Sequence, residues 1–84
     1  MNVVLKEKKE RDKFLLQLGE HLRKKRLSKG ISAGELSRRC FMDKPNLFRI
    51  EKGRMNPSIY ILHKLADALE ITLEELLRGF KPHS

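Results

Sequence analysis

Apolar residues recur along this chain at the spacing of helices, and no stretch alternates apolar and polar residues as a surface β-strand would. The first pattern spans about residues 14–28, where Leu15, Leu18 and Leu22 follow one another at helical intervals. Gly30 comes next, and glycine is common just past a helix end because it adopts positive φ without strain. We therefore predict a helix over residues 14–28.

Two short helices joined by a tight turn are predicted next, within residues 31–57. Ser32 and Glu35 form an S-x-x-E capping box, which marks the start of the first of them. The turn falls on residues 41–43. The second of these helices spans about residues 43–52 and carries a proline in its first turn, where the missing N–H is no loss.

The helix predicted over residues 43–52 has two unlike sides. Leu47, Ile50 and Glu51 share one side, which we expect to face the core. The other side and the N-terminal tip hold Lys44, Pro45, Asn46, Phe48, Arg49 and Lys52. This cationic side is either an ordinary solvated surface or a binding surface for a polyanion.

A fourth helix is predicted over residues 58–69, with Asn56-Pro57 as its N-cap and first helical residue. Its core stripe is expected to comprise Ile59, Leu62, Leu65, Ala66 and Leu69. A fifth helix starts at a capping box of Thr72 and Glu75 and ends at Gly79. The chain is therefore expected to be all-α.

Residues 1–13 are nearly all charged after Leu5. Their opposite charges stand four residues apart in two pairs, Lys6 with Glu10 and Glu7 with Arg11, which favours a helix. Short isolated helices are marginally stable, so the segment is a frayed helical extension or a disordered arm. A basic arm that reaches DNA is an alternative, and residues 3–5 could instead pack on a partner subunit.

The length and composition of the chain limit which kinds of structure and function we expect. The chain of 84 residues makes one domain, and its single cysteine, Cys40, excludes an intrachain disulfide and the common zinc patterns. We expect a cytoplasmic protein, because neither a signal sequence nor a membrane-length apolar run is present. No catalytic set stands out, since His21, His63 and His83 are scattered, so we expect no enzyme, metal, cofactor or small-molecule ligand.

The net charge of +8 is unevenly placed. Residues 1–30 hold ten basic against four acidic residues, and residues 31–57 hold six against three, whereas residues 58–84 hold three against four. A polyanion that binds one side of the molecule would explain this asymmetry, although many small soluble domains are basic.

Several motifs stand in one order and spacing: Leu18-Gly19-Glu20, Arg26, Gly30-Ile31-Ser32, Leu36, Ile50-Glu51-Lys52-Gly53, Asn56-Pro57, Leu62, Ala66, Leu69 and Leu76. This set resembles the Cro/repressor-type helix-turn-helix domain, the XRE family, over about residues 14–78. The resemblance implies a five-helix lambda-repressor-like DNA-binding domain over residues 14–79. Residues 1–13 would then be an arm or helix extension, and residues 80–84 a short tail.

The resemblance also implies a role for individual residues. The third helix would enter the major groove of double-stranded DNA, and the positions that match base-facing ones are Lys44, Pro45, Asn46 and Arg49. Arg49 is the expected main base reader, because a guanidinium donates two bonds to guanine. The positions expected to contact the DNA backbone are Ser32, Arg38, Phe48, Lys52, Arg54 and Asn56.

A buried ion pair of the family carries over to Arg26 and Glu51. Arg26 lies one turn past Leu22, on the inward side of the first helix, where an unpaired charge is costly. Pairing with Glu51 would remove that cost.

The chain departs from the family pattern at five positions, which are Ala33 for a phosphate-contacting Gln, Ser37 for Ala, Phe41 for a turn Gly, Pro45 for a polar base reader, and Glu70 for Gly or Asn. Phe41 is expected to distort the turn, because a bulky residue at positive φ is strained. Pro45 can touch a thymine methyl but cannot donate a hydrogen bond, and it disfavours helical geometry at the residue before it.

Apolar residues in the last third suggest a partner. Tyr60, Ile61, Leu77 and Phe80 are either scattered surface residues or a two-fold dimer interface. A dimer would place two copies of the third helix about 34 Å apart, one turn of DNA, and would read a short palindromic operator. The sequence thus favours a homodimeric transcriptional regulator, most simply a repressor. The alternative is an antitoxin or other protein-interaction module of the same fold.

Overall fold

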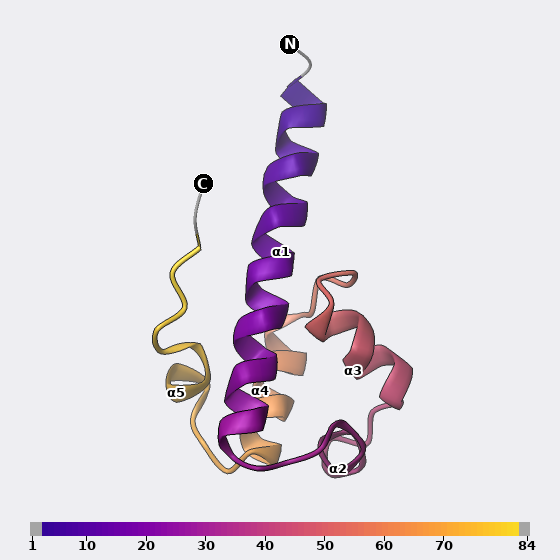
Figure 1. Ribbon diagram of the computed structural model, residues 1–84, viewed down its shortest axis with the longest axis vertical. Coiled ribbons are helices and arrows are strands. Elements are labelled where there is room, and N and C mark those ends of the chain that lie inside the picture. Colours follow the sequence, from indigo (N-terminus) through magenta and orange to yellow (C-terminus); the bar gives the residue numbers. More distant parts are fainter. Residues whose placement is uncertain (1–2, 83–84) are drawn as a thin grey trace.

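The computed structural model describes residues 3–82, which form five helices and no strand (Figure 1). The helices are α1 (Val3–Ser28), α2 (Ala33–Arg39), α3 (Lys44–Glu51), α4 (Ile59–Ala68) and α5 (Leu73–Leu77). This confirms the all-α, five-helix prediction. Residues 1, 2, 83 and 84, which include His83 and the outer ends of the expected arm and tail, lie outside the described residues.

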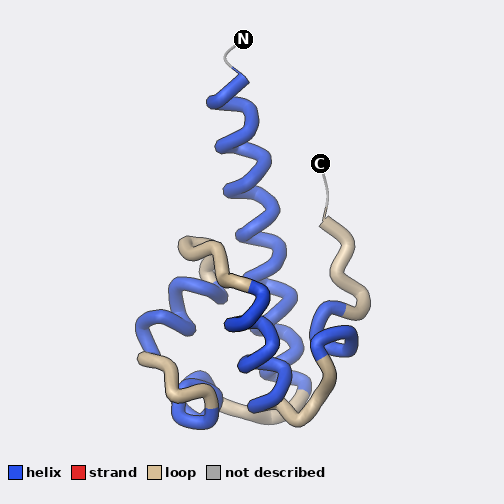
Figure 2. Tube along the Cα trace, turned by 180° about the vertical axis from the view of Figure 1, so that it is seen from behind, coloured by secondary structure: helices blue, strands red, loops and turns tan. Residues whose placement is uncertain are grey.

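Helix α1 begins eleven residues earlier than the hydrophobic pattern predicted, at Val3 instead of Phe14. The segment 3–13 is therefore a helical extension, one of the two forms expected for it. It projects beyond the other helices, as Figures 1 and 2 both show. The extension holds an ion pair at i,i+4 spacing between Lys8 and Asp12, with 3.1 Å from Nζ to Oδ2.

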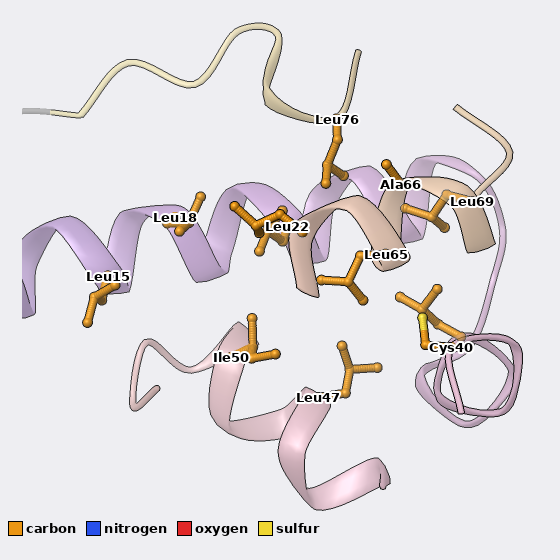
Figure 3. Packing of buried hydrophobic residues seen from close by; sticks show 12 residues of the cluster. Leu15, Leu18, Leu22, Cys40, Leu47, Ile50, Leu65, Ala66, Leu69 and Leu76 are labelled. Carbon is orange, nitrogen blue, oxygen red and sulfur yellow. The ribbon is translucent and has the colours of Figure 1, made fainter. Parts of the chain in front are cut away.

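The core lies where α1, α3, α4 and α5 meet, with α2 closing one end (Figure 3). All three leucines of the predicted α1 stripe are buried. The buried apolar residues are Leu15, Leu18, Leu22, Leu36, Cys40, Leu47, Ile50, Leu62, Leu65, Ala66, Leu69 and Leu76. The apolar periodicity thus identified most of the core.

The start of α4 differs from the prediction. Its N-cap is Ser58, whose hydroxyl accepts a hydrogen bond from the Ile61 N–H at 3.1 Å, and not Asn56. Pro57 is buried ahead of the helix and does not form its first turn. Ile59 was expected in the core stripe but is 66% exposed, because it is the first residue of α4 and lies a full turn before Leu62.

Two glycines bring the backbones of α1 and the end of α3 into direct contact. A Cβ added to Gly19 would lie 2.4 Å from the Ile50 carbonyl oxygen, and one added to Gly53 would lie 2.6 Å from the Cα of Leu16. Gly53 also has a φ of +72°, which glycine adopts without strain. These contacts fix the position of α3 on α1 at the level of the main chain.

The connections after α2 and α4 each place a non-glycine residue at positive φ. Phe41 in the turn between α2 and α3 has φ 55°, and Glu70 after α4 has φ 60°. Phe41 is 94% exposed, so no packing of its side chain offsets the unfavourable backbone. The unusual turn expected at Phe41 is therefore a real feature of the main chain.

Candidate nucleic-acid interface

The inward side of α3 packs against the core. Leu47 and Ile50 are each 1% exposed. Glu51 accepts two bonds from Arg26, with Nε at 2.8 Å from Oε2 and Nη2 at 3.0 Å from Oε1. A third bond runs from Arg26 Nη1 to the Ile31 carbonyl oxygen at 3.0 Å.

The ion pair of Arg26 and Glu51 is largely withdrawn from water, since each side chain is 8% exposed. The hydrogen bonds that the guanidinium donates to Glu51 raise the pKa of Arg26, against the effect of burial, which lowers it. Because the pair ties α1 to the last residue of α3, it sets the direction in which α3 presents its outer side.

The outer side of α3 carries the residues expected to face bases. Lys44, Pro45 and Arg49 are exposed and Asn46 is half-buried. The Arg49 Nη1 donates to Asn46 Oδ1 at 2.7 Å, so these two residues, both expected to face bases, are hydrogen-bonded to each other. Asp43 precedes the helix in an extended conformation, and Lys44 is its first residue.

Cations flank the aromatic ring of Phe48 at the other end of α3. The Lys52 ammonium lies 5.6 Å and the Arg54 guanidinium 5.9 Å from the ring centroid. Such contacts contribute roughly 0.5–1 kcal/mol at an exposed site. The Phe48 ring therefore holds the cations of Lys52 and Arg54 close together near the C-terminal end of α3.

Helix α2 and its N-cap hold two of the residues predicted to contact the DNA backbone, Ser32 and Arg38. Ser32 caps α2, and its hydroxyl accepts from the Glu35 N–H at 3.1 Å, which is one half of the predicted capping box; the Glu35 carboxylate bonds arginines of α2 in place of the Ser32 N–H. Glu35 binds both Arg39, at 2.9 Å, and Arg38, and these bonds hold the pKa of Glu35 below its usual range. Arg38 is thus exposed but already paired with a carboxylate of its own helix.

Arg39 has a second partner that the sequence did not reveal. Its Nη1 donates to the Ala68 carbonyl oxygen at the end of α4, at 3.1 Å. Arg39 therefore braces α2 against α4, whereas Arg38 faces solvent. Adjacent arginines on a helix have different roles because they point about 100° apart.

The residues expected at a dimer interface do not form one group within the chain. Tyr60 is 66% exposed and contacts His63 and Lys64 of its own helix. Phe80 packs edge-on against Phe14 of α1 at 5.3 Å between ring centroids. Ile61 and Leu77 are partly buried and pack on the core. Ile59, next to Tyr60 and equally exposed, was not among the predicted residues.

Two other kinds of site are absent from residues 3–82. No group of three or more His, Cys, Asp or Glu side chains there could hold a metal ion. No helix of this part of the chain is long and apolar enough to cross a membrane. Cys40 is buried, and burial raises the pKa of its thiol, so it behaves as an apolar core residue.

The chain is similar to known helix-turn-helix proteins. A helix-turn-helix family model, HTH_3, matches residues 22–76. The HTH-type transcriptional regulator DdrOP3 of Deinococcus deserti is 34% identical over 64 residues, which are 76% of this chain and 50% of the relative. The chain thus spans about half the length of that curated relative.

Solved structures of regulators share the fold. The restriction-modification controller protein C.AhdI from Aeromonas hydrophila is 35% identical, with a TM-score of 0.70 over 74% of this chain and 94% of that one. The clp gene regulator ClgR from C. glutamicum is 28% identical, with a TM-score of 0.71 over 76% and 83% of the two chains. Together with an α3 that packs against the core and has a cationic outer side, these matches place the chain in the Cro/repressor-type (XRE) helix-turn-helix family of DNA-binding transcriptional regulators.

Proposed function

We propose that this protein is a sequence-specific regulator of transcription that inserts α3 into the major groove of double-stranded DNA, and that it acts as a repressor. The observation that carries the proposal is that the two sides of α3 differ in burial and charge. One side packs on the core and is fixed to α1 by an ion pair and a backbone contact, while the other presents exposed cationic groups and a half-buried amide. A rigid element with such an outer side suits base recognition.

Base readout is assigned to the N-terminal and outer part of α3. Arg49 and Lys44 donate to guanine edges, Asn46 orients Arg49 through its 2.7 Å bond and contacts an adjacent base, and Pro45 touches a thymine methyl. The assignment rests on the exposure of Lys44, Pro45 and Arg49, on the bond between Asn46 and Arg49, and on the place of all four in the family pattern.

Phosphate contacts are assigned to residues on either side of α3. On the α2 side they are Ser32, whose hydroxyl proton remains available to donate, and Arg38, which would exchange Glu35 for a phosphate. On the other side are Phe48 with its two cations, Lys52 and Arg54, and the exposed Asn56. The two groups would hold the DNA backbone on both sides of the groove.

The proposal includes a homodimer on a palindromic operator. An exposed apolar pair, Ile59 and Tyr60, stands at the start of α4, and Ile61, Leu77 and Phe80 are only partly covered. Two-fold pairing would bring two copies of α3 to successive major grooves.

A second candidate is an antitoxin or interaction module of the same fold, favoured by the same exposed apolar pair. The two candidates differ in the main partner of the protein, which is DNA for the regulator and another protein for the antitoxin or interaction module. Selection of bound sites from random duplexes tests the regulator directly, because it reports the sequence and the spacing between half-sites together. Recovery of no enriched sequence, with the protein folded, would refute sequence-specific binding.

A further inference from the structure

The helical extension of α1 lies beside the loop that follows α3. An open cleft joins them, and it is lined by Arg11, Asp12 and Leu15 from α1 and by Gly53, Arg54 and Asn56 from the loop. Two of these loop residues are assigned above to the DNA backbone. One side of the extension therefore continues the surface that is proposed to hold phosphates.

Helical spacing shows which residues of the extension share that side. Leu15 packs into the core, and Arg11 and Lys8 precede it by four and seven residues, so they lie on one stripe. Lys6 and Lys9 lie about 180° and 120° around the helix from Leu15. Arg11 thus lines the cleft and Lys8 continues its stripe along the extension, whereas Lys6 and Lys9 lie on other sides of the helix.

The cations on the stripe are available to an external anion. Asp12 contacts both, at 3.1 Å from Lys8 Nζ and 3.8 Å from Arg11 Nε, so one carboxylate faces two positive charges. All three side chains are more than half exposed. Exposed pairs of this kind contribute little to stability and exchange readily for a stronger anion.

We propose that Lys8 and Arg11 contact phosphates of the same duplex that α3 reads, which makes the extension a second, sequence-independent clamp on the DNA backbone. The proposal rests on the function proposed above. Lys8 and Arg11 are separated by about 4.5 Å along the helix axis, so both cations can meet one stretch of the DNA backbone. The extension has no role in reading bases in this proposal.

The test compares two double variants that remove the same charge. Lys8→Gln/Arg11→Gln removes the cations of the stripe, and Lys6→Gln/Lys9→Gln removes two from elsewhere on the extension. Binding of each to a mixed-sequence duplex several turns long is followed by fluorescence anisotropy between about 50 and 200 mM salt. Circular dichroism checks that both variants keep the helix content of the parent.

The stripe variant is expected to have a shallower plot of log affinity against log salt, by about 1.8, and at 0.1 M salt each missing phosphate neutralisation should lower its affinity by roughly eightfold. The control variant should keep the parent slope. Restoring a cation in Lys8→Gln/Arg11→Lys should recover about half of the slope that the double substitution removes.

Other outcomes overturn the proposal. Equal reductions in affinity in the two double variants would mean a general charge effect, and an unchanged slope in the stripe variant would mean that the stripe does not touch DNA. An unchanged slope with a lower mass by light scattering would assign the extension to a protein interface. Parent protein that binds the duplex with no steep salt dependence would refute the proposed function as well, so the two failures are distinguishable.

Discussion

Arg49 and Arg54 differ in what surrounds them, although both are exposed arginines within six positions of each other. Arg49 is held by Asn46 on the outer side of α3, whereas Arg54 lies past the helix end, near the Phe48 ring. In the proposed function, a side chain fixed on α3 would report base identity, whereas one in the loop would reach only the DNA backbone.

Arg49→Ala should therefore change specificity. Removal of a bidentate contact costs about 1–3 kcal/mol of discrimination at one base position, so the preferred sequence should become degenerate there. Site selection with the variant measures this. As the matched control, Arg54→Ala should weaken binding to all sequences alike and lower the salt slope by about 1. An unchanged preference in Arg49→Ala would show that another residue reads the base.

The buried ion pair makes a prediction about stability. Arg26→Met leaves the Glu51 carboxylate buried without its two donors, which should lower the free energy of unfolding by about 3–5 kcal/mol. Urea denaturation measures the change. The double variant Arg26→Met/Glu51→Leu removes both charges and should recover most of the stability. A double variant as unstable as the single one would show that packing, not the charge, is what Arg26 supplies.

At the level of elements, the close contact between α1 and α3 requires glycine at position 19, because a side chain there would meet the backbone of α3. Gly19→Ala should separate the two helices or strain them, because the new Cβ would sit 2.4 Å from a carbonyl oxygen. We expect the free energy of unfolding to fall by about 1–3 kcal/mol.

Gly34→Ala is the matched control for that substitution. Its nearest neighbour is the flexible end of Arg38 at 3.8 Å, so the added methyl meets no backbone. The gain in helix propensity should stabilise the protein by up to about 1 kcal/mol. Thermal unfolding of both variants gives the comparison, and equal effects of the two alanines would contradict the close backbone approach at Gly19.

The corrected start of α4 can be tested in the same way. Ser58→Ala removes the acceptor for the Ile61 N–H and should cost about 1 kcal/mol of unfolding free energy. Asn56→Ala should leave stability nearly unchanged, since Asn56 is exposed and lies outside the helix. A larger destabilisation at Asn56 than at Ser58 in chemical denaturation would restore Asn56 as the cap.

The sequence predicted helices where apolar periodicity and capping chemistry agreed. The N-cap at Ser32, the capping box at Thr72 and the α1 stripe were found because each rests on residues close in the chain. The N-cap of α4 was misplaced because Asn56 and Ser58 are both good caps two positions apart, and Pro57, the expected first helical residue, is instead buried ahead of the helix. Local pattern cannot supply that burial.

The candidate DNA-binding site was predicted less completely than the helices, because several of its features depend on contacts between segments that are distant in the chain. The α3 residues follow from one helix and a family pattern, and the structure places them together. The second bond of Arg39 to α4, the exposure of Ile59 and the cleft between Arg11 and the α3–α4 loop involve contacts between distant segments. Charge spacing in residues 1–13 indicated a helix but not which of its sides meets that loop.

At the scale of the whole molecule, the exposed apolar pair at the start of α4 predicts an oligomer. Ile59→Asp/Tyr60→Asp should convert a dimer to a monomer by light scattering at tens of micromolar, roughly ten times a micromolar dissociation constant. Charges placed at a shared two-fold surface would face each other and repel.

Leu27→Asp is the control for that experiment, since it introduces an acid at another apolar position that is 48% exposed and is not among the proposed interface residues. Its mass should match that of the parent. A parent protein that is monomeric both alone and with its selected operator would end the dimer proposal, whatever the variants do.

The backbone contact at Gly19 and Gly53 has a consequence for how such proteins diversify. Because α3 is held by main-chain atoms and by residues on its inner side, the outer residues take no part in fixing its position. Exchanges at positions 44, 45, 46 and 49 can therefore accumulate with little effect on folding. The same frame could carry many operator preferences, and libraries varied only at those positions should remain largely folded.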